Sequence, residues 1–431
     1  MKTKCMIFLC LILILFALFV CSVSSVQPTV VYLRDGGNGD GSSYEQATGD
    51  FRDAVRVLKE KGGTIIVCGK YTFSELINLS EKSGTSNGKN LIKVTSVDGE
   101  KDYRVLNGAS INVGDDQKSG NMILAGEFVF ENININTSGS EKARAIIANG
   151  FRITFGEGII CNKYGKAPYI SIIGGSIDED IKKYCEVVIK SGSYYNVCAS
   201  NKNGMYKGNT ILTIDGGVFE GQVSVTGLED EGSIKSGNAQ MIVNGGTFIN
   251  NAGALTQADN VIFTVNNGNF NNDIILLGKK NTFEINGGFF QRTGSIKIGI
   301  NNNTDDEDNN LGEKSVLNIN QYSGDMNNLI SKIVSNNLII NTKTDGGSDF
   351  RAETTSVSES VNQDNETSIN VPKETALNEQ TSDNATGNTT DRAYFLGTRQ
   401  KTVFAIIILF AIVLFASIVF SYRMANRKNK Y

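Results

Sequence analysis

The acidic side chains are the first candidates for chemistry in this chain of 431 residues, because it contains no histidine. Histidine is the commonest general base and a favoured ligand for zinc and copper. Acid–base cleavage of a glycan would instead need two carboxylates at a set separation. The acids gather in three short runs, at residues 178–180, 229–231 and 305–308. Such runs usually lie in solvated loops, so we assign no catalytic residue and leave open whether the chain is an enzyme.

Residues 35–43, which read DGGNGDGSS, are similar to part of a calcium-binding loop. Asn38, Asp40 and Gly41 suit such a loop, but Ala47 occupies its last position, where an acidic ligand is needed. We therefore expect a surface turn, and we predict neither a metal site nor a cofactor.

Four cysteines remain once the apolar N-terminal segment is set aside: Cys68, Cys161, Cys185 and Cys198. Their spacings lack the short C-x-x-C pairs that zinc sites use. Cys185 and Cys198 lie 13 positions apart and could form a bridge across a turn. One disulfide and buried free thiols are both open at this point.

Six N-x-S/T sequons are candidate N-glycosylation sites, although several are expected by chance in a chain rich in asparagine. They are Asn78, Asn136, Asn302, Asn365, Asn384 and Asn388.

The acidic, cysteine and asparagine side chains named above belong to a fold that is indicated by a pattern occurring five times in residues 187–290. Its copies read VVIKSGSY, LTIDGGVF, MIVNGGTF, FTVNNGNF and FEINGGFF. Apolar residues stand three and five positions before the last glycine, which is the spacing of a strand with one buried face. The last glycines are Gly192, Gly217, Gly246, Gly268 and Gly288. The residues two after them are aromatic: Tyr194, Phe219, Phe248, Phe270 and Phe290. The residues two before them are polar: Lys190, Asp215, Asn244, Asn266 and Asn286.

The distances between the repeats select the fold class. The glycines lie 25, 29, 22 and 20 residues apart, which is typical of a stacked repeat. Helical repeats would need apolar spacings of three and four. The pattern therefore predicts an all-β fold, a right-handed parallel β-helix or solenoid in which each repeat is one coil. Aromatic, aliphatic and asparagine side chains would then stack in separate ladders.

The I-x-G-G-x-F units resemble those of bacterial and protist surface proteins in the pectin-lyase-like β-helix superfamily, over roughly residues 30–341. The resemblance implies the fold and no single activity, because members include polysaccharide lyases, hydrolases and adhesins. The lyases and hydrolases place several aspartates on the outer faces of neighbouring coils. In the polar column of this chain Asp215 is the only acid.

A helix is predicted to precede the stack and cover its open end. Asp50 can cap it, and it runs from Phe51 to about Lys59 before two glycines stop it. An exposed strand edge invites aggregation, which such a helix prevents. Its apolar face consists of Phe51, Ala54, Val55 and Leu58.

The two ends of the chain predict secretion and a membrane anchor. Residues 1–25 have the basic, apolar and small-residue pattern of a cleaved signal peptide, with an uncleaved anchor helix as the alternative. Residues 401–422 are predicted to be a transmembrane helix, and the basic tail at 423–431 would stay in the cytoplasm. That tail argues against a lipid-anchor signal. Between them, residues 26–345 form the predicted ectodomain and 346–400 a disordered stalk rich in Ser, Thr, Asn and Glu.

These features predict a type I protein of the plasma membrane, with its N-terminus outside the cell. The regularly spaced outer faces of a solenoid suit adhesion to an extracellular glycan or a host surface. A membrane-tethered polysaccharide lyase or glycoside hydrolase and a passive coat or spacer protein stay open as alternatives. The net charge of −4 and the lack of a basic block in the middle region argue against nucleic acid as a partner.

Overall fold

The computed structural model describes residues 29–354, except 60, 74–76, 80–89, 114–120, 177–183, 203, 230–232, 236, 292–293, 300–313, 321, 336–337 and 344–348. The chain divides into two compact units, 1–361 and 362–431, and all described residues belong to the first. The predicted signal peptide, transmembrane helix, tail and most of the stalk lie outside the described residues. Among the helices that are described, none has the length and apolar character needed to span a membrane.

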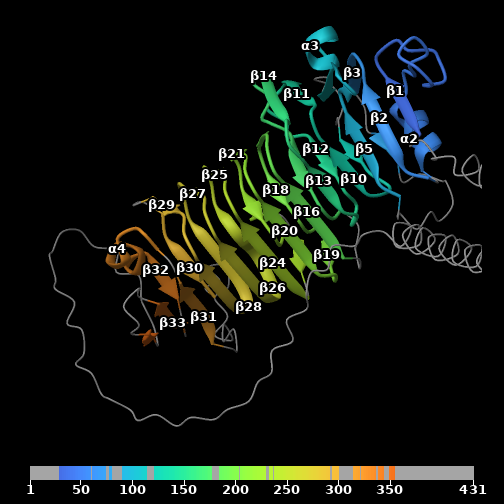
Figure 1. The fold of residues 1–431 in the computed structure, drawn as a ribbon. Helices are drawn as coiled ribbons and strands as arrows, with labels where there is room; N and C mark the ends of the chain where they lie inside the picture. Colours follow the sequence, from blue (N-terminus) through green and yellow to red (C-terminus); the bar gives the residue numbers. More distant parts are fainter. Residues whose placement is uncertain are drawn as a thin grey trace, which may run out of the picture. The chain divides into compact units, whose positions relative to one another are not determined.

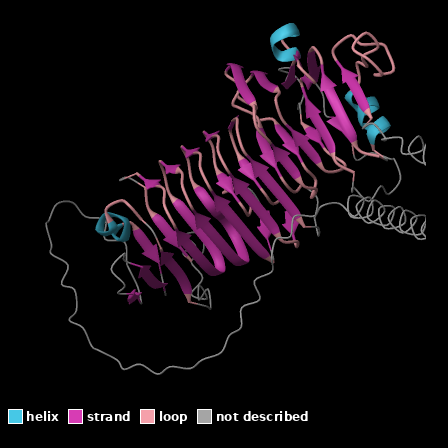
Figure 2. Ribbon diagram, in the orientation of Figure 1, coloured by secondary structure: helices cyan, strands magenta, loops and turns pink. Residues whose placement is uncertain are grey.

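The described residues form an all-β fold of mostly parallel strands, which stack in three columns (Figures 1 and 2). Each strand pairs with the strand one repeat further along the chain, an arrangement consistent with a β-helix. We call one set of three successive strands a coil.

The first column is continuous along the stack in Figure 1, and its strands pair in parallel from one coil to the next. It consists of β1 (Val30–Leu33), β2 (Gly63–Val67), β5 (Ile92–Thr95), β10 (Phe128–Phe130), β13 (Ile153–Phe155), β16 (Cys185–Ile189), β20 (Thr210–Ile214), β24 (Asn238–Val243), β26 (Ala252–Val265), β28 (Ile274–Ile285), β31 (Ser315–Ile319) and β33 (Leu338–Lys343).

The second column has two parts, of longer and then shorter strands. The first part is β3 (Lys70–Phe73), β8 (Ser110–Val113), β11 (Asn134–Gly139) and β14 (Ile160–Gly165). The second part is β17 (Ser193–Tyr194), β21 (Val218–Phe219), β25 (Thr247–Phe248), β27 (Asn269–Phe270) and β29 (Phe289–Phe290).

The third column also contains the first residues of β26 and β28, which continue into the first column of the next coil. Its other members are β4 (Ile77–Asn78), β9 (Met122–Ile123), β12 (Ala145–Ile147), β15 (Ser171–Ile173), β18 (Val197–Cys198), β22 (Val223–Ser224), β30 (Ile296–Ile298) and β32 (Ile333–Ser335).

Short elements leave the columns. The hairpin of β6 (Val97–Asp98) and β7 (Lys101–Asp102) leads into α3 (Tyr103–Asn107), and α4 (Met326–Ser331) precedes β32. Strands β19 (Gly204–Tyr206) and β23 (Ser233–Lys235) pair with each other. Strand β34 (Asp349–Thr354) pairs antiparallel with β33, although its residues were predicted as the start of the stalk. It gives hydrogen-bond partners to the edge of the last parallel strand, which would otherwise be open.

The glycine turns follow the sequence prediction. Gly192, Gly217, Gly246, Gly268 and Gly288 have φ values of 107°, 109°, 103°, 133° and 99°. A side chain at this backbone angle is strained, so glycine recurs where each coil turns from its first column into its second.

The aromatic residues of the repeat form the predicted column in the core. Phe248 lies between Phe219 and Phe270, with ring centroids 5.0 Å and 4.6 Å away and nearly parallel planes. The column continues to Phe290 and, at a tilt, to Tyr322. The four phenylalanine rings are almost fully buried and Tyr322 is partly buried, and stacking adds to the free energy gained by burial.

The predicted amide ladder is also present. Asn244 donates its Nδ2–H to Asp215, Asn266 to Asn244 and Asn286 to Asn266, each over 2.7 Å. Asn320 extends the ladder by donating to Asn286. Because Asn244, Asn266 and Asn286 each donate one ladder bond and accept another, the ladder links successive coils on the surface at their shared turn.

Helix α2 (Phe51–Leu58) confirms the predicted N-terminal helix. Asp50 caps it by accepting the backbone N–H of Arg52 over 2.8 Å. The helix contacts β1 and β2, at the N-terminal end of the stack (Figure 2). Its buried residues are the predicted ones: Phe51, Ala54, Val55 and Leu58.

Candidate binding groove on the outer face

A groove of about 420 Å³ crosses β20, β24, β26 and β28 on the outside of the first column. We call it the outer groove. Its floor is a row of residues held in register by the sheet: Ile211, Gln240, Ile262 and Thr282. Parallel strands lie about 4.8 Å apart, so the row offers one side chain at each such interval.

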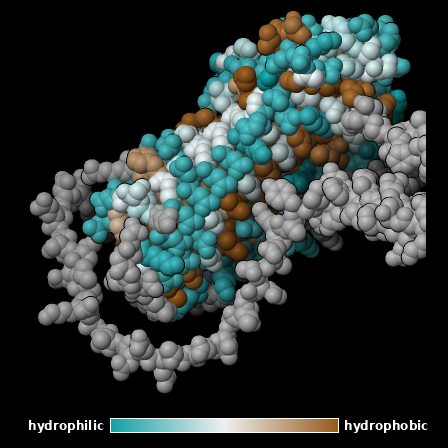
Figure 3. Space-filling model, viewed as in Figure 1, coloured by the Kyte–Doolittle hydropathy of each residue, from teal (hydrophilic) through white to brown (hydrophobic). Residues whose placement is uncertain are grey.

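The alternation of the strands explains why these side chains face outward. Ala239 and Val261 point into the core and are 1% exposed, whereas their neighbour Ile262 is 42% exposed. Figure 3 shows hydrophobic residues scattered among hydrophilic ones on the side of the stack that is in view. The floor therefore combines apolar contact area with hydrogen-bonding groups.

One side of the outer groove carries amides. Asn260 donates its Nδ2–H to Asn238 Oδ1 over 2.9 Å, and the backbone N–H of Asn238 donates to Asn209 Oδ1 over 3.2 Å. All three line the groove and are exposed. Each amide keeps donor or acceptor capacity toward solvent, which is the capacity that sugar hydroxyls require.

Tyr184 stands at the rim of the outer groove with 53% of its surface exposed. Its hydroxyl donates to Glu186 Oε2 over 3.4 Å, and that carboxylate also pairs with Arg152. Burial, and then the neighbouring Glu186 carboxylate, raise the pKa of Tyr184. The ring is thus a neutral, anchored platform on which a sugar face can stack.

The lining of the outer groove holds amides, hydroxyls, a lysine and apolar groups, and no carboxylate. Elsewhere on the described surface, acids pair with bases from other coils, as in Lys163–Glu220 at 2.7 Å and Lys297–Asp273 at 3.1 Å. Within the described ranges, no three Cys, Asp or Glu side chains come together as metal ligands. The chemistry of the groove is therefore that of binding by hydrogen bonds and apolar contact.

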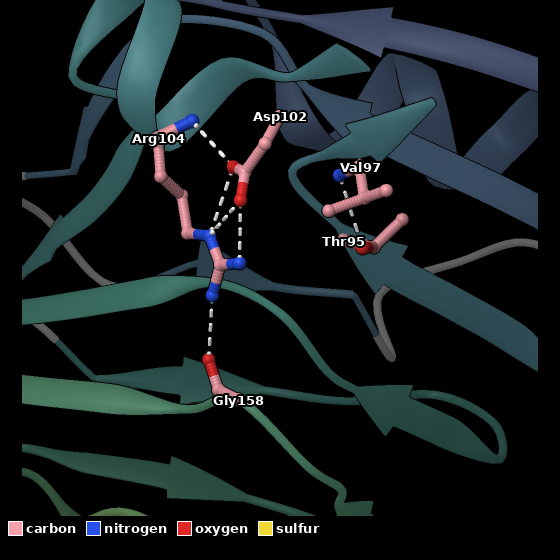
Figure 4. A network of polar contacts seen from close by, with 5 residues as sticks. All are labelled: Thr95, Val97, Asp102, Arg104 and Gly158. Atoms are coloured by element: carbon pink, nitrogen blue, oxygen red, sulfur yellow. Dashed lines mark hydrogen bonds and ion pairs between the residues drawn. The ribbon is translucent and has the colours of Figure 1, made fainter. Parts of the chain in front are cut away.

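A partly buried ion pair between Asp102 and Arg104 holds α3 in place (Figure 4). Arg104 donates to both carboxylate oxygens of Asp102, which is also the helix cap, and to the carbonyl of Gly158 over 2.8 Å. Its hydrogen bonds lower the pKa of Asp102. The pair holds residues 97–109, which leave the columns, against a later coil. Both charges therefore have a structural role.

Residues 35–43, which are similar to part of a calcium-binding loop, form a surface turn, as expected. Asp40 Oδ1 accepts the backbone N–H of Ser42 over 2.9 Å. Hydrogen bonds from the Ser42 side chain and then from its backbone lower the pKa of the Asp40 carboxyl. The backbone N–H of Gly39 donates to the carbonyl of Ala47 over 3.1 Å. Asn38 forms a β-bridge with Thr48 in the same turn.

Cys68, Cys161, Cys185 and Cys198 are buried and form no disulfide in this structure, so Cys185 and Cys198 are not joined to each other. Cys198 lies in the core wall and its thiol donates to the carbonyl of Thr226 over 2.9 Å. Burial raises the pKa of Cys161 to about 12 and that of Cys185 higher still. These thiols resist ionisation and hence reaction.

Two of the six sequons lie in the described residues. Asn136 belongs to a second amide ladder: it donates Nδ2–H to Asn112 Oδ1 and accepts from Asn162 Nδ2, both over 2.9 Å. Its amide nitrogen is therefore engaged between coils. Asn78 ends β4, and Asn302, Asn365, Asn384 and Asn388 lie outside the described residues, as do the acidic runs except Glu229.

The chain matches no protein-family model, and neither a curated protein nor a solved structure shows significant similarity to it. The outer groove was not predicted from the sequence. The residues that line the groove differ from repeat to repeat, because they lie between the apolar positions that recur. They therefore form no pattern that the sequence alone would reveal.

Proposed function

We propose that this chain is a cell-surface recognition protein whose ectodomain is a right-handed parallel β-helix of the pectin-lyase-like type. In this proposal the outer groove binds an extended extracellular glycan. A single C-terminal span would hold the protein in the plasma membrane with the ectodomain outside.

The observation that carries the proposal is the outer groove itself. The amides of Asn238 and Gln240 on β24 and of Asn260 on β26 line the groove together with the exposed ring of Tyr184 and the apolar side chain of Ile262. Glycan sites combine hydrogen-bonding groups with flat apolar area in this way, because a sugar ring has polar edges and less polar faces. The repeat along the stack suits a polymer whose units also repeat.

The pairing of the strands supports the proposal of a right-handed parallel β-helix. Parallel strands in one sheet need crossovers, which are right-handed in nearly all proteins, and each coil here provides them by way of the other two columns. The membrane anchor rests on the apolar run at 401–422 and the basic residues after it.

A glycan array probed with the full-length protein in detergent micelles tests the binding proposal. We expect binding to one group of oligosaccharides, with affinity that increases with chain length over a few units. Tyr184→Ala and Gln240→Ala should each weaken binding about tenfold, the loss of one stacking or hydrogen-bonding contact. Asn269→Ala, an exposed change on the second column, is the matched control.

Two results would overturn the proposal. One is the absence of binding to any oligosaccharide on the array. The other is binding that Tyr184→Ala and Gln240→Ala leave as strong as Asn269→Ala does.

A further inference from the structure

A second, smaller pocket lies away from the outer groove, where the chain turns from the second column into the third. It has a volume of about 170 Å³ and includes Tyr195, Asn196, Gln222, Glu229 and Asn250 in its wall. We call it the Glu229 pocket. It is small for a whole ligand and has room for one monosaccharide or the end of one long side chain.

Glu229 is held in the wall by Gln222 through a reciprocal pair of hydrogen bonds. Gln222 Nε2 donates to Glu229 Oε2 over 2.7 Å, and the backbone N–H of Glu229 donates to Gln222 Oε1 over 3.0 Å. Asn251 Nδ2 also donates to Oε2, over 3.0 Å. The second carboxylate oxygen, Oε1, accepts no hydrogen bond from the described residues.

The segment before Glu229 is fixed by the coil next to it. Thr226 Oγ1 accepts the backbone N–H of Thr256 over 3.0 Å, and Thr256 Oγ1 accepts the backbone N–H of Gly227 over 2.7 Å. Leu228 is buried at 3% exposure. The carboxylate is therefore held in one orientation before any ligand arrives, which lowers the entropic cost of binding.

The Glu229 pocket contains a negative charge without a described counter-ion. Among the ion pairs of the described residues, none involves Glu229, whereas Glu220 close by in the sequence pairs with Lys163. Asn196 Oδ1 accepts the backbone N–H of Gln222, and Asn250 Oδ1 accepts that of Asn251, each over 2.8 Å. An amide oxygen has two lone pairs, so each keeps one.

These groups suit a primary ammonium better than a metal ion. Calcium takes six to eight oxygen ligands, usually with several carboxylates, and the pocket wall contains one carboxylate. An ammonium has three N–H donors and one positive charge. The acceptors match it in number: Glu229 Oε1 and the amide oxygens of Asn196 and Asn250.

We propose that the Glu229 pocket binds a primary ammonium group. The source of that group is either an unacetylated amino sugar or a lysine side chain of a protein. The site is separate from the outer groove and does not depend on glycan binding there.

Calorimetric titration of the full-length protein tests this inference with three probes: a glucosamine hexamer, its fully N-acetylated form, and a lysine-containing peptide with blocked termini. We expect binding of an amine probe that is at least about tenfold tighter than binding of the acetylated hexamer, because acetylation removes the charge. Binding should weaken as salt is raised.

The variant Glu229→Gln keeps the size of the side chain and removes the charge. It should reduce amine binding about tenfold or more, whereas Glu284→Gln, a surface carboxylate on β28, should not change it. If the glucosamine hexamer alone binds, the ligand is an amino sugar. If the peptide alone binds, the ligand is a lysine side chain of a protein. If both bind, the pocket recognises the ammonium group that they share.

The inference is overturned if neither amine probe binds, or if the acetylated hexamer binds as tightly as the free amine. It is also overturned if Glu229→Gln, with an unchanged melting temperature, binds as tightly as the unaltered protein. Should Glu229→Gln fail to fold, the comparison of acetylated and free probes on the unaltered protein still decides the matter.

Discussion

Replacing Phe248 by alanine tests the stacked core. Its ring is fully buried and lies between two others at centroid distances of 5.0 Å and 4.6 Å. Truncating a buried phenylalanine costs about 3–5 kcal/mol, because apolar burial is lost and a cavity is left. The two stacking contacts place Phe248→Ala toward the upper part of that range.

Phe289 provides the matched control for this substitution. It lies on β29 beside the buried Phe290, yet it faces outward and is 60% exposed. Because little of its area is removed from water, Phe289→Ala should cost less than about 1 kcal/mol.

Urea unfolding of the full-length protein, followed by far-ultraviolet circular dichroism, measures both changes. The expected result is a much lower unfolding midpoint for Phe248→Ala than for Phe289→Ala, with similar slopes. Equal midpoints for the two variants would refute the reasoning, since Phe248 would then not be enclosed by its neighbours.

Three further predictions follow from polar contacts and buried thiols. Asn266→Ala removes one donated and one accepted ladder bond and should cost about 1–2 kcal/mol in urea unfolding, whereas Asn269→Ala should be neutral within about 0.5 kcal/mol; equal costs would exclude a stabilising ladder. Peptide mass spectrometry of protein from eukaryotic cells should find Asn136 without a glycan, because its Nδ2 donates to Asn112; a fully glycosylated Asn136 would contradict that. Burial raises the pKa of Cys161 from 9.0 to about 12, so the unfolded state loses its proton first. The contribution of the Cys161 thiol to the free energy of unfolding is fully present below pH 9 and is lost between about pH 9 and 12. The melting temperature should therefore fall over this interval, and a rise would contradict the prediction.

The repeat made the core predictable, because its constraints are local. Glycine with positive φ, an aromatic two residues later and aliphatic residues two apart each have one physical cause, and all five copies behave alike. Asn320 was missed because no glycine follows it at the usual place, although it follows Ile319 as Asn286 follows Ile285.

The sites were less predictable, because they depend on which coils lie next to each other. The outer groove joins Ile211, Gln240 and Ile262, whose spacing along the chain varies with loop length. The orientation of Glu229 depends on Gln222 and on Asn251 from the following coil. These contacts join residues of different coils and do not occur within one repeat. The sequence therefore shows an acidic run at 229–231 and does not reveal the pocket.

The stacking of one coil on the next is the central claim, and distances between spin labels test it most directly. One outward row of the first column passes in register through Thr154, Thr264, Glu284 and Asn341. Labels would be attached to cysteines introduced at these positions, since the native cysteines are buried.

Pulsed electron paramagnetic resonance should give separations from position 154 that increase with each strand crossed. At about 4.8 Å per strand, the expected backbone separations are roughly 19 Å to 264, 24 Å to 284 and 34 Å to 341. Separations that do not increase in this order would contradict the parallel stack, and with it both proposed binding sites.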